Sequence, residues 1–504
     1  MNCMNKPSSN APAHESPIMS SSCSTILSPI SPLSRILSIS SPQFQDRSHS
    51  SLSTVPPDLL RISNCQLKDL NLSGNKLKVL PSNFFILVSL RRLDLSNNEL
   101  VKISSELELL FKLEELNISR NNLSSIPENI KSLKKLQILD ISLNPISSIP
   151  SGLVLIPSLQ VLSLNNLYLT ELPEDIGLLS CLTSLEVRDN YLTSLPYSME
   201  RLSQLVRLDL GNNQLDCLDV PLTSCFNLKE LWLDSNQIVR IPAEIKNLSH
   251  LTFLDLSGNL LESVPEELSF LSSLTHLYLT GNRLSSLPNS LSSLSSLTHL
   301  NLSQNLITDL PFNLGECKEL VELSVACNYL TSFPKQLGFL TSLIYLNLAT
   351  NRLTNIPSEV GMLKQLGVLI LRKNNLRSLP EEISGCCKLT VLDLRCNYLQ
   401  NVPMSLARIN LKALWLAENQ SKPLPSLQDD IDKTTNSSVL SCCLLPQVKV
   451  QEEDDWGMEI IRLLNMKYNK MTDISSVTTS DLECSPVRSK KGSVRTVQYR
   501  WPGT

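Results

Sequence analysis

One short pattern recurs along this chain with an almost unvarying step, and the recurrence restricts what the chain can fold into. In Leu90-Arg-Arg-Leu93-Asp-Leu95-Ser-Asn-Asn98-Glu-Leu100, leucines alternate with polar residues and an asparagine follows. The pattern returns every 23 residues, with its asparagine at Asn75, Asn98, Asn121, Asn144, Asn190, Asn213, Asn236, Asn259, Asn282, Asn305, Asn328, Asn351, Asn374 and Asn397. One copy carries Leu167 instead, and a copy one residue shorter follows at Asn419. About sixteen such units are typical of a solenoid of stacked repeats.

Each position of the repeat has a structural task that its residue type suits. The alternating segment from Leu90 to Leu95 predicts a short strand whose leucines face the core. The asparagine stands where the chain leaves the strand, and its amide can bond the backbone of its own turn and of the neighbouring repeat. Six residues later a proline such as Pro265 follows in most copies, while Ser104 and Asp219 replace it in two. Because proline fixes φ and lacks an N–H, it suits the start of the returning segment.

These tasks predict one architecture for most of the chain. We expect an α/β leucine-rich-repeat solenoid, a curved horseshoe with a parallel β-sheet on its concave face and short helical, 3-10 or extended segments on its convex face. We place about sixteen repeats in residues 57–427 and a C-terminal cap segment in residues 428–447. We expect a disordered Ser/Pro-rich leader over residues 1–56 and a mostly disordered tail over residues 448–504.

Composition and motifs narrow the function classes. The formal net charge of -4 argues against a nucleic-acid binder, because such a protein needs a concentrated basic face. The 14 cysteines are dispersed, without metal spacing or cysteine-rich caps, which predicts a reduced, cytoplasmic protein. No phosphate-binding glycine loop, nucleophile elbow or zinc motif occurs. We therefore expect no enzyme activity, and no catalytic residue, metal, cofactor or small-molecule substrate.

The outward positions of the predicted sheet lie six, four, two and one residues before each asparagine. In the ten copies from Asn75 to Asn282 these positions hold four bases, namely Arg92, Arg120, Arg188 and Arg207. They also hold ten acids, namely Asp69, Asp94, Glu115, Asp140, Glu186, Asp189, Asp209, Glu230, Asp234 and Asp255. We expect an acidic inner face that favours basic segments of a partner protein and steers their approach.

Aromatic residues gather in one part of this predicted face. Trp232, Phe253 and Tyr278 occupy outward positions in three successive copies, with His276 and His299 beside them. Exposed aromatics on neighbouring strands are typical of a binding hot spot, which makes these residues candidates for the partner-binding site. The alternative is that the rings only pack against one another across the strands. The sequence leaves both interpretations open.

The last copy and the segment behind it resemble a known family. Leu411-Lys-Ala-Leu-Trp-Leu-Ala-Glu-Asn-Gln420, followed by Cys443-Leu-Leu-Pro-Gln447, resembles the end of the repeat domain in the LAP family of leucine-rich-repeat and PDZ polarity scaffolds, its Scribble and Lano branches most closely. The fifth copy, with Leu167, is similar too. The resemblance implies a cytoplasmic scaffold for polarity or signalling proteins, peripheral at the basolateral plasma membrane and cell junctions.

The chain departs from that family at both ends. No PDZ-like segment follows the repeats before Thr504, so we expect binding to come from the repeat face and the tail. The family's paired N-terminal cysteines are replaced by the Ser/Pro-rich leader, which leaves the mode of membrane attachment open. An adaptor for Ras-like GTPase or type-1 protein phosphatase signalling is the alternative. Arg495-Thr-Val-Gln-Tyr499 resembles the short motif that docks on that phosphatase.

Overall fold

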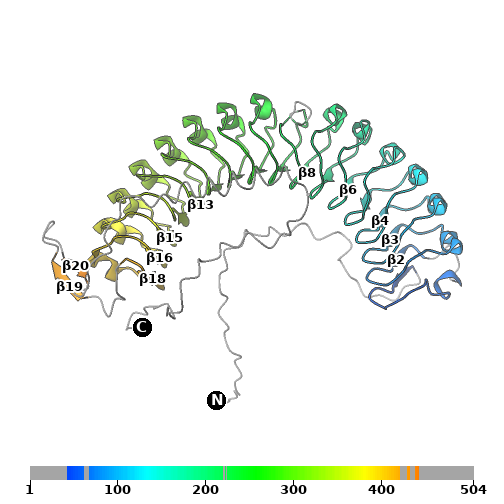
Figure 1. The fold of residues 1–504 in the computed structure, drawn as a ribbon, viewed down its shortest axis with the longest axis horizontal. Coiled ribbons are helices and arrows are strands. Elements are labelled where there is room, and N and C mark those ends of the chain that lie inside the picture. Colours follow the sequence, from blue (N-terminus) through cyan, green and yellow to red (C-terminus); the bar gives the residue numbers. More distant parts are fainter. Residues whose placement is uncertain are drawn as a thin grey trace, which may run out of the picture.

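The computed structural model of the chain describes residues 43–61, 67–218, 222, 224–419, 428–431 and 438–441. In this part the repeats form a continuous arch, with strands along its inner side and 3-10 turns along its outer side (Figure 1). Seventeen parallel strands form one sheet in which neighbours along the chain are neighbours in space. The predicted solenoid, with a parallel sheet on the concave face and 3-10 segments on the convex face, is therefore confirmed.

The strands of the large sheet are three residues long and recur once per repeat. They are β1 (Phe44–Asp46), β2 (Asp69–Asn71), β3 (Arg92–Asp94), β4 (Glu115–Asn117), β5 (Ile138–Asp140), β6 (Val161–Ser163), β7 (Ser184–Glu186), β8 (Arg207–Asp209), β9 (Glu230–Trp232), β10 (Phe253–Asp255), β11 (His276–Tyr278), β12 (His299–Asn301), β13 (Glu322–Ser324), β14 (Tyr345–Asn347), β15 (Val368–Ile370), β16 (Val391–Asp393) and β18 (Ala413–Trp415). Most adjacent strands pair with a shift of 23 residues, so that equivalent side chains stand in rows across the sheet.

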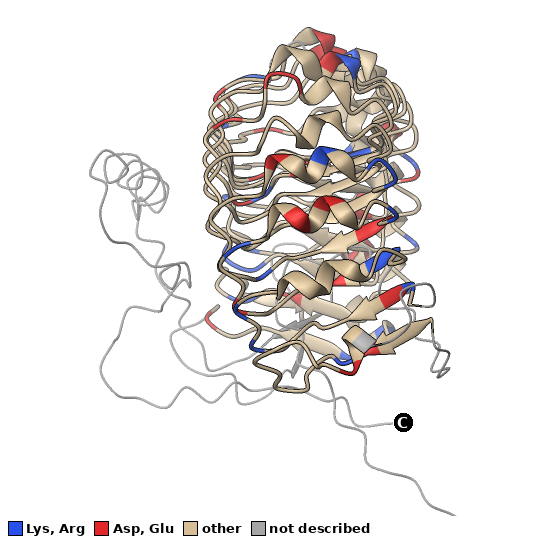
Figure 2. Cartoon of the chain, turned by 90° about the vertical axis from the view of Figure 1, so that its right-hand side faces the viewer, with Lys and Arg blue, Asp and Glu red and all other residues tan. Residues whose placement is uncertain are grey.

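The outer side consists of short 3-10 helices, one for nearly every repeat. They are η2 (Leu59–Arg61), η3 (Ser82–Ile86), η4 (Ser105–Leu109), η5 (Glu128–Ser132), η6 (Leu153–Leu155), η7 (Ile176–Leu178), η8 (Tyr197–Arg201), η9 (Ala243–Asn247), η10 (Glu266–Phe270), η11 (Asn289–Ser293), η12 (Phe312–Glu316), η13 (Lys335–Phe339), η14 (Ser358–Met362), η15 (Glu381–Gly385) and η16 (Met404–Arg408). Lys, Arg, Asp and Glu are interspersed on these turns and loops when the arch is viewed from its N-terminal end (Figure 2). No helix among the described residues is long and apolar enough to span a membrane.

The repeat proline stands at the N-cap of most 3-10 helices. Pro265 and Pro334, for example, have extended backbone immediately before η10 and η13. Ser104, which replaces the proline in its repeat, caps η4 through its side chain, whose Oγ accepts from the N–H of Glu106 at 3.2 Å. A fixed φ or a capping hydroxyl therefore starts the same turn.

Leucines fill the space between the sheet and the outer turns. In the unit around Asn259, the side chains of Leu251, Leu254, Leu256 and Leu261 are completely buried. Equivalent residues of all units form one hydrophobic core that runs along the described repeats. Because each layer covers the next, no unit buries its apolar face alone.

The repeat asparagine bonds the backbone of two successive repeats. Asn259 Nδ2 donates to the carbonyl oxygens of Leu256 at 3.0 Å and of Leu233, in the preceding repeat, at 2.9 Å. Its Oδ1 accepts from the N–H of Ile238 at 3.0 Å. The same donation to the preceding repeat recurs at Asn98, Asn121, Asn144, Asn190, Asn213, Asn236, Asn282, Asn305, Asn328, Asn351, Asn374 and Asn397. All these side chains are at most 8% exposed, so the ladder is internal.

In the copy without an asparagine, a backbone N–H of the preceding repeat finds another acceptor. In the regular repeats the second residue after each asparagine donates its N–H to the next asparagine, as Leu123 does to Asn144. Leu167 offers no such acceptor, and the N–H of Ile146 donates instead to the carbonyl oxygen of Asn144 at 2.8 Å. The Leu167 side chain is 2% exposed and joins the core. One gap in the ladder is thus closed by a local backbone bond.

The first strand lies inside the segment that the sequence pattern assigns to the leader. β1 pairs in parallel with β2, and Asn75 Oδ1 accepts from the N–H groups of Ser50 and Leu52. Residues 43–56 therefore belong to the solenoid, and the boundary expected at residue 57 is wrong. The cap lacks the leucine and asparagine spacing because it covers only one side of the first full repeat. Residues 1–42 lie outside the described residues.

The expected C-terminal cap segment, residues 428–447, is described in two strands. β19 (Gln428–Ile431) pairs antiparallel with β20 (Ser438–Ser441), which also pairs with β17 (Asn401–Pro403) of the last repeats. Val439 of β20 is 6% exposed. The described strands thus form a small sheet at the C-terminal end of the arch (Figure 1). The rest of the segment and the tail, residues 448–504, lie outside the described residues.

Glycines let the outer turns approach one another closely toward the C-terminal half. A Cβ placed on Gly338 in η13 would lie 2.4 Å from the backbone oxygen of Glu359, and one on Gly361 in η14 would lie 2.1 Å from that of Glu382. A methyl group at either position would force adjacent repeats apart. Gly367, at the start of β15, is different, because its Cβ would meet nothing closer than 3.6 Å.

We expect Asn259→Ala to lower the free energy of unfolding by about 1–3 kcal/mol, because buried backbone groups lose their partners. Urea denaturation followed by circular dichroism measures this loss. Asn289→Ala is the matched control, since Asn289 is exposed at the start of η11. Equal losses in the two variants would contradict the role given to the ladder.

Gly338→Ala should lower the free energy of unfolding by about 1–3 kcal/mol through overpacking of the outer turns. Gly367→Ala adds the same methyl group where there is room for it, so its stability should stay close to that of the wild type. Urea denaturation of both variants tests this contrast. If Gly367→Ala were destabilised while Gly338→Ala kept the stability of the wild type, the contacts between outer turns would not limit the distance between adjacent repeats.

Candidate functional site

The concave face of β8 to β13 brings the predicted site residues together in two rows. Glu230, Phe253, His276 and His299 are successive partners in one row. Trp232, Asp255 and Tyr278 are successive partners in the next row, two residues further along each strand. Residues 23 positions apart in sequence thereby become lateral neighbours. The asparagine ladder and the leucine core hold these rows in place, because the asparagines bond the backbone just after each strand and the leucines pack beneath the sheet.

Five of these residues, Trp232, Phe253, His276, Tyr278 and His299, form what we call the aromatic cluster. The Phe253 ring centroid lies 4.7 Å from that of Trp232, 5.5 Å from that of Tyr278 and 5.8 Å from that of His276. The imidazoles of His276 and His299 stack with centroids 4.3 Å apart. The rings therefore form a continuous group along the arch, in which the two imidazoles are stacked and the other rings are tilted against one another.

Exposure differs within the aromatic cluster. Phe253 is only 8% exposed, so the expectation that it faces solvent is wrong. It lies between rings on both neighbouring strands, and those rings cover it. Trp232, Tyr278, His276 and His299 are partly exposed. Phe253 thus packs internally, while the other four present part of their rings on the concave face.

Arg207 closes one end of the aromatic cluster. Its guanidinium carbon lies 4.3 Å from the centre of the Trp232 ring, within the range of a cation–π contact. The same guanidinium forms ion pairs with Glu186 at 3.3 Å and with Glu230 at 3.2 Å. Trp232 is therefore flanked by Arg207 on one strand and by Phe253 on the other.

Arg188 links three repeats beside the cluster. Its Nε lies 3.1 Å from Asp209, and its Nη1 donates to Asp234, two repeats away, at 3.0 Å. The side chain crosses Gly211, where a Cβ would lie 2.2 Å from Nη2, so only glycine leaves room for it. Burial alone would lower the pKa of Arg188, but the bonds to Asp234 and Asp209 raise it above its ordinary value. The cation is therefore permanent.

These ion pairs change the expected charge of the inner face. Asp209, Glu230 and Asp234 are each paired with an arginine, and Asp69 is paired with Arg92 at 2.6 Å. Acids still outnumber bases there, but half of the ten acids are paired with arginines within the fold. The strength of attraction for a basic partner depends on the carboxylates that remain.

Asp255 is one of those remaining carboxylates. It stands between Trp232 and Tyr278 in the same row, and among the described residues it forms no ion pair within 4.0 Å. Burial raises the pKa of Asp255 to about 6, although the bond from Ser257 N–H opposes the shift. A carboxyl group that titrates close to neutral pH therefore lies inside the aromatic cluster.

The C-terminal repeats carry a different surface. Arg372 and Lys373 follow β15, and Arg395 follows β16, where it pairs with Asp393 at 2.7 Å and lies 5.4 Å from the Trp415 ring centre. The concave face thus changes from acidic and aromatic to basic along the arch. A partner that spans it would meet both kinds of surface.

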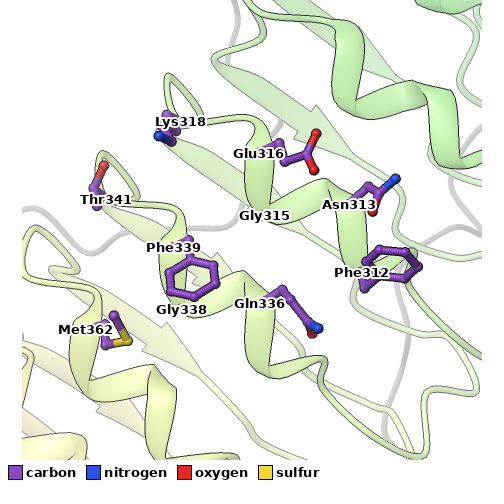
Figure 3. Close-up of a pocket in the computed structure, with 10 residues that line it drawn as sticks. All are labelled: Phe312, Asn313, Gly315, Glu316, Lys318, Gln336, Gly338, Phe339, Thr341 and Met362. Atoms are coloured by element: carbon purple, nitrogen blue, oxygen red, sulfur yellow. The ribbon is translucent and has the colours of Figure 1, made fainter.

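A shallow pocket lies on the opposite, convex face between η12, η13 and η14 (Figure 3). Its lining includes Phe312, Phe339 and Met362, which are 57%, 48% and 44% exposed. Gly315 and Gly338, both buried, also line it. Its charged lining side chains are Glu316 and Lys318. The pocket is an apolar surface and offers no nucleophile–base pair.

Thiols and metal-binding groups do not form a reactive site in the described repeats. No group of three or more His, Cys, Asp or Glu side chains there is placed to hold a metal ion. The described cysteines form no disulfide with one another, and burial raises the pKa of Cys225, Cys317 and Cys386 to about 11. These three thiols stay protonated at neutral pH and behave as small core residues.

The raised pKa of Asp255 predicts how stability depends on pH. Because the folded pKa of about 6 exceeds the ordinary value of an aspartate, 3.8, the fold disfavours the carboxylate, and this penalty grows as pH rises from about 4 to about 6. Asp255→Asn should therefore stabilise the fold above about pH 6 and flatten its pH dependence. Asn301 and Asn347 already occupy this repeat position with the same turn bond, so the variant is conservative. Urea denaturation across this pH range measures it, and an unchanged profile would contradict it.

The comparisons with known proteins agree with this architecture. Family models described as "Leucine rich repeat" match residues 65–123 and 226–284, and one described as "Leucine Rich repeats (2 copies)" matches residues 272–316. The TDR receptor is 28% identical, covers 72% of this chain and 70% of that chain, and gives a TM-score of 0.60. The Arabidopsis receptor kinase HAESA ectodomain, solved with an IDA peptide hormone ligand, is 27% identical, with 72% and 71% covered and a TM-score of 0.54.

One similarity is high enough to indicate kinship beyond the fold. A leucine-rich-repeat protein of Leptospira interrogans is 33% identical to this chain. The match covers 74% of this chain and 89% of that chain, with a TM-score of 0.64. Together with the repeat ladder, the parallel sheet and the 3-10 turns, this similarity identifies the chain as a member of the leucine-rich-repeat family.

Proposed function

We propose that the chain is a protein-interaction scaffold that holds its partner on the concave face at the aromatic cluster. The observation that carries this proposal is the gathering of Trp232, His276, Tyr278 and His299, all partly exposed, on three of the four adjacent strands β9 to β12. Partly exposed aromatic side chains are enriched at the centres of protein interfaces, because they bury a large area at little cost in conformational entropy. The leucine-rich-repeat fold is typically an interaction scaffold and not an enzyme.

A segment of protein is the kind of partner that such a face suits. The HAESA ectodomain, similar in fold, was solved with a peptide hormone ligand. In this chain the rows of outward side chains repeat along the arch, so an extended segment can contact several strands in succession. Basic segments are favoured, because unpaired carboxylates such as Asp255 and Glu322 lie on the face without an arginine or lysine within 4.0 Å in the described repeats.

We further propose that the scaffold acts in cell polarity, as a cytoplasmic protein peripheral at the basolateral membrane and at cell junctions. The support is the resemblance of residues 411–420 and 443–447 to the LAP family. The second candidate is an adaptor for Ras-like GTPase or type-1 phosphatase signalling. Its support is the segment Arg495–Tyr499, which lies outside the described residues.

The interaction role is tested by Trp232→Ala combined with Tyr278→Ala. We expect this double variant to lose captured partner proteins by at least about tenfold, because truncating interface anchors costs about 2 kcal/mol or more each. Quantitative affinity capture from epithelial lysate measures the loss. Tyr197→Ala, on the exposed convex side, is the matched control and should capture as the wild type does. Undiminished capture by the double variant would rule out the concave site.

Proximity labelling in polarised epithelial cells separates the two cellular roles. A polarity scaffold should label junction and basolateral proteins, whereas a signalling adaptor should label Ras-like GTPases or phosphatase subunits. Enrichment of the second group without the first would reject the polarity role. The same labelling with the Trp232→Ala and Tyr278→Ala variant shows which neighbours depend on the concave face.

A further inference from the structure

The stacked imidazoles of His276 and His299, here called the histidine pair, are held in a defined orientation by two threonines. Thr275 Oγ1 lies 2.8 Å from His276 Nδ1, and Thr298 Oγ1 lies 2.8 Å from His299 Nδ1. The two rings are parallel to within 7° and their centroids are 4.3 Å apart. Each strand therefore presents its imidazole in the same way.

The hydrogen-bond network assigns the tautomer of both rings. The hydroxyl of Thr275 donates its one proton to the carbonyl oxygen of Thr252 at 2.8 Å, and that of Thr298 donates to Thr275 at 2.9 Å. A hydroxyl has a single hydrogen, so towards the imidazole each threonine oxygen can only accept. The proton of the neutral ring therefore lies on Nδ1, and Nε2 is left as an acceptor.

Both Nε2 atoms lie at the far edge of the ring from the strand, because Nε2 is distal to Cβ. Among the residues that the structure describes, neither Nε2 has a hydrogen-bond partner. Both side chains are partly exposed on the concave face. In the neutral state the histidine pair thus offers two parallel acceptors to anything that lies in the arch.

Negative charge flanks the histidine pair on both sides. Glu322 of β13 stands beside His299 in the same row, and Asp255 of β10 lies one strand before His276. The outward positions of β10 to β14 carry no Lys or Arg, in contrast to the flanking repeats with Arg207 and Arg372. The outward positions of β10 to β14, which we call the window, are therefore rich in hydrogen-bond acceptors and free of competing cations.

Resting on the proposed function, we propose that the histidine pair, together with Asp255 and Glu322, binds an extended segment of a partner protein that carries two basic side chains, and releases it when the imidazoles are protonated. Three strand spacings of about 4.8 Å separate the two carboxylates, so four to five residues of extended chain cover the window. Basic residues at the ends of such a segment meet the carboxylates, and a polar donor between them meets Nε2.

Protonation of the two imidazoles reverses which groups this part of the concave face can bind. An imidazolium donates from Nε2 and carries a positive charge, so it neither accepts from a donor nor attracts a cation. Burial and the neighbouring His299 lower the pKa of His276, which keeps the acceptor form dominant at neutral pH. Besides Asp255 and Glu322, the titratable groups that face the pair from the adjoining strands are Tyr278 and Tyr345. Burial raises the pKa of Tyr345 above its ordinary value, so this phenol stays protonated in the acidic range.

The test uses the full chain and a fluorescein-labelled peptide, Gly-Arg-Ser-Gln-Ser-Arg-Gly, in fluorescence anisotropy titrations at about pH 7.5 and about pH 5.5. The wild type should bind more weakly at the lower pH. His276→Phe combined with His299→Phe should reduce affinity at the higher pH by about tenfold and leave only the pH dependence that comes from the Asp255 carboxyl group. Phe253 already occupies this row, so phenylalanine keeps the ring stack. An unchanged thermal midpoint by circular dichroism verifies the fold.

Two further variants separate the effect of the histidine pair on binding from the effects of Asp255 and of a histidine elsewhere on the chain. His250→Phe alters an exposed histidine outside the stack and should bind as the wild type does. Asp255→Asn should weaken binding and remove only the part of the pH dependence that comes from its own carboxyl group, because the histidine pair is unchanged. The proposal is overturned if the histidine double variant retains wild-type affinity and pH response, if Asp255→Asn alone abolishes that response, or if a peptide with glutamate in place of arginine binds equally well. The proposed function is decided by a different result. It stands if the double variant Trp232→Ala with Tyr278→Ala still loses its cellular partners, even when the peptide experiment overturns the histidine proposal.

Discussion

The buried asparagine amide is the interaction on which the rest of the structure depends. At each turn out of a strand, backbone groups of two repeats face the core, where water cannot satisfy them. One side chain, such as Asn259, satisfies carbonyls in its own and the preceding repeat and accepts an N–H as well. This shared bonding fixes the distance between successive repeats. The leucine layers can then cover one another, and their burial stabilises the fold.

The ladder also decides what the concave face can do. Since each strand is held at its end, side chains 23 residues apart become rigid neighbours, and a site is assembled from single residues of many repeats. The aromatic cluster and the ion pairs of Arg188 and Arg207 arise in this way. The irregular repeats show how much variation the scaffold tolerates. Leu167 interrupts the ladder without interrupting the sheet, because Ile146 bonds the backbone locally.

Function on such a face depends on which groups remain unpaired. Arginines neutralise Asp209, Glu230 and Asp234, whereas Asp255, Glu322 and the Nε2 atoms of the histidine pair have no such partner among the described residues. A partner bound as we propose meets partly exposed aromatic rings beside acceptors that change with pH. Recognition of this kind needs no cavity, because the curvature of the arch already brings several strands to one ligand.

The sequence alone determined the repeat length, the inward leucines, the asparagine ladder and the residues that share the concave face, because a fixed 23-residue step makes position in the repeat equivalent to position in space. It did not reveal β1, which lacks the pattern, nor that Phe253 is covered by its neighbours. Ring stacking, the reach of Arg188 across Gly211 and the tautomer of the histidine pair depend on contacts between repeats. Such contacts follow from side-chain directions across strands, and only the tertiary structure decided them.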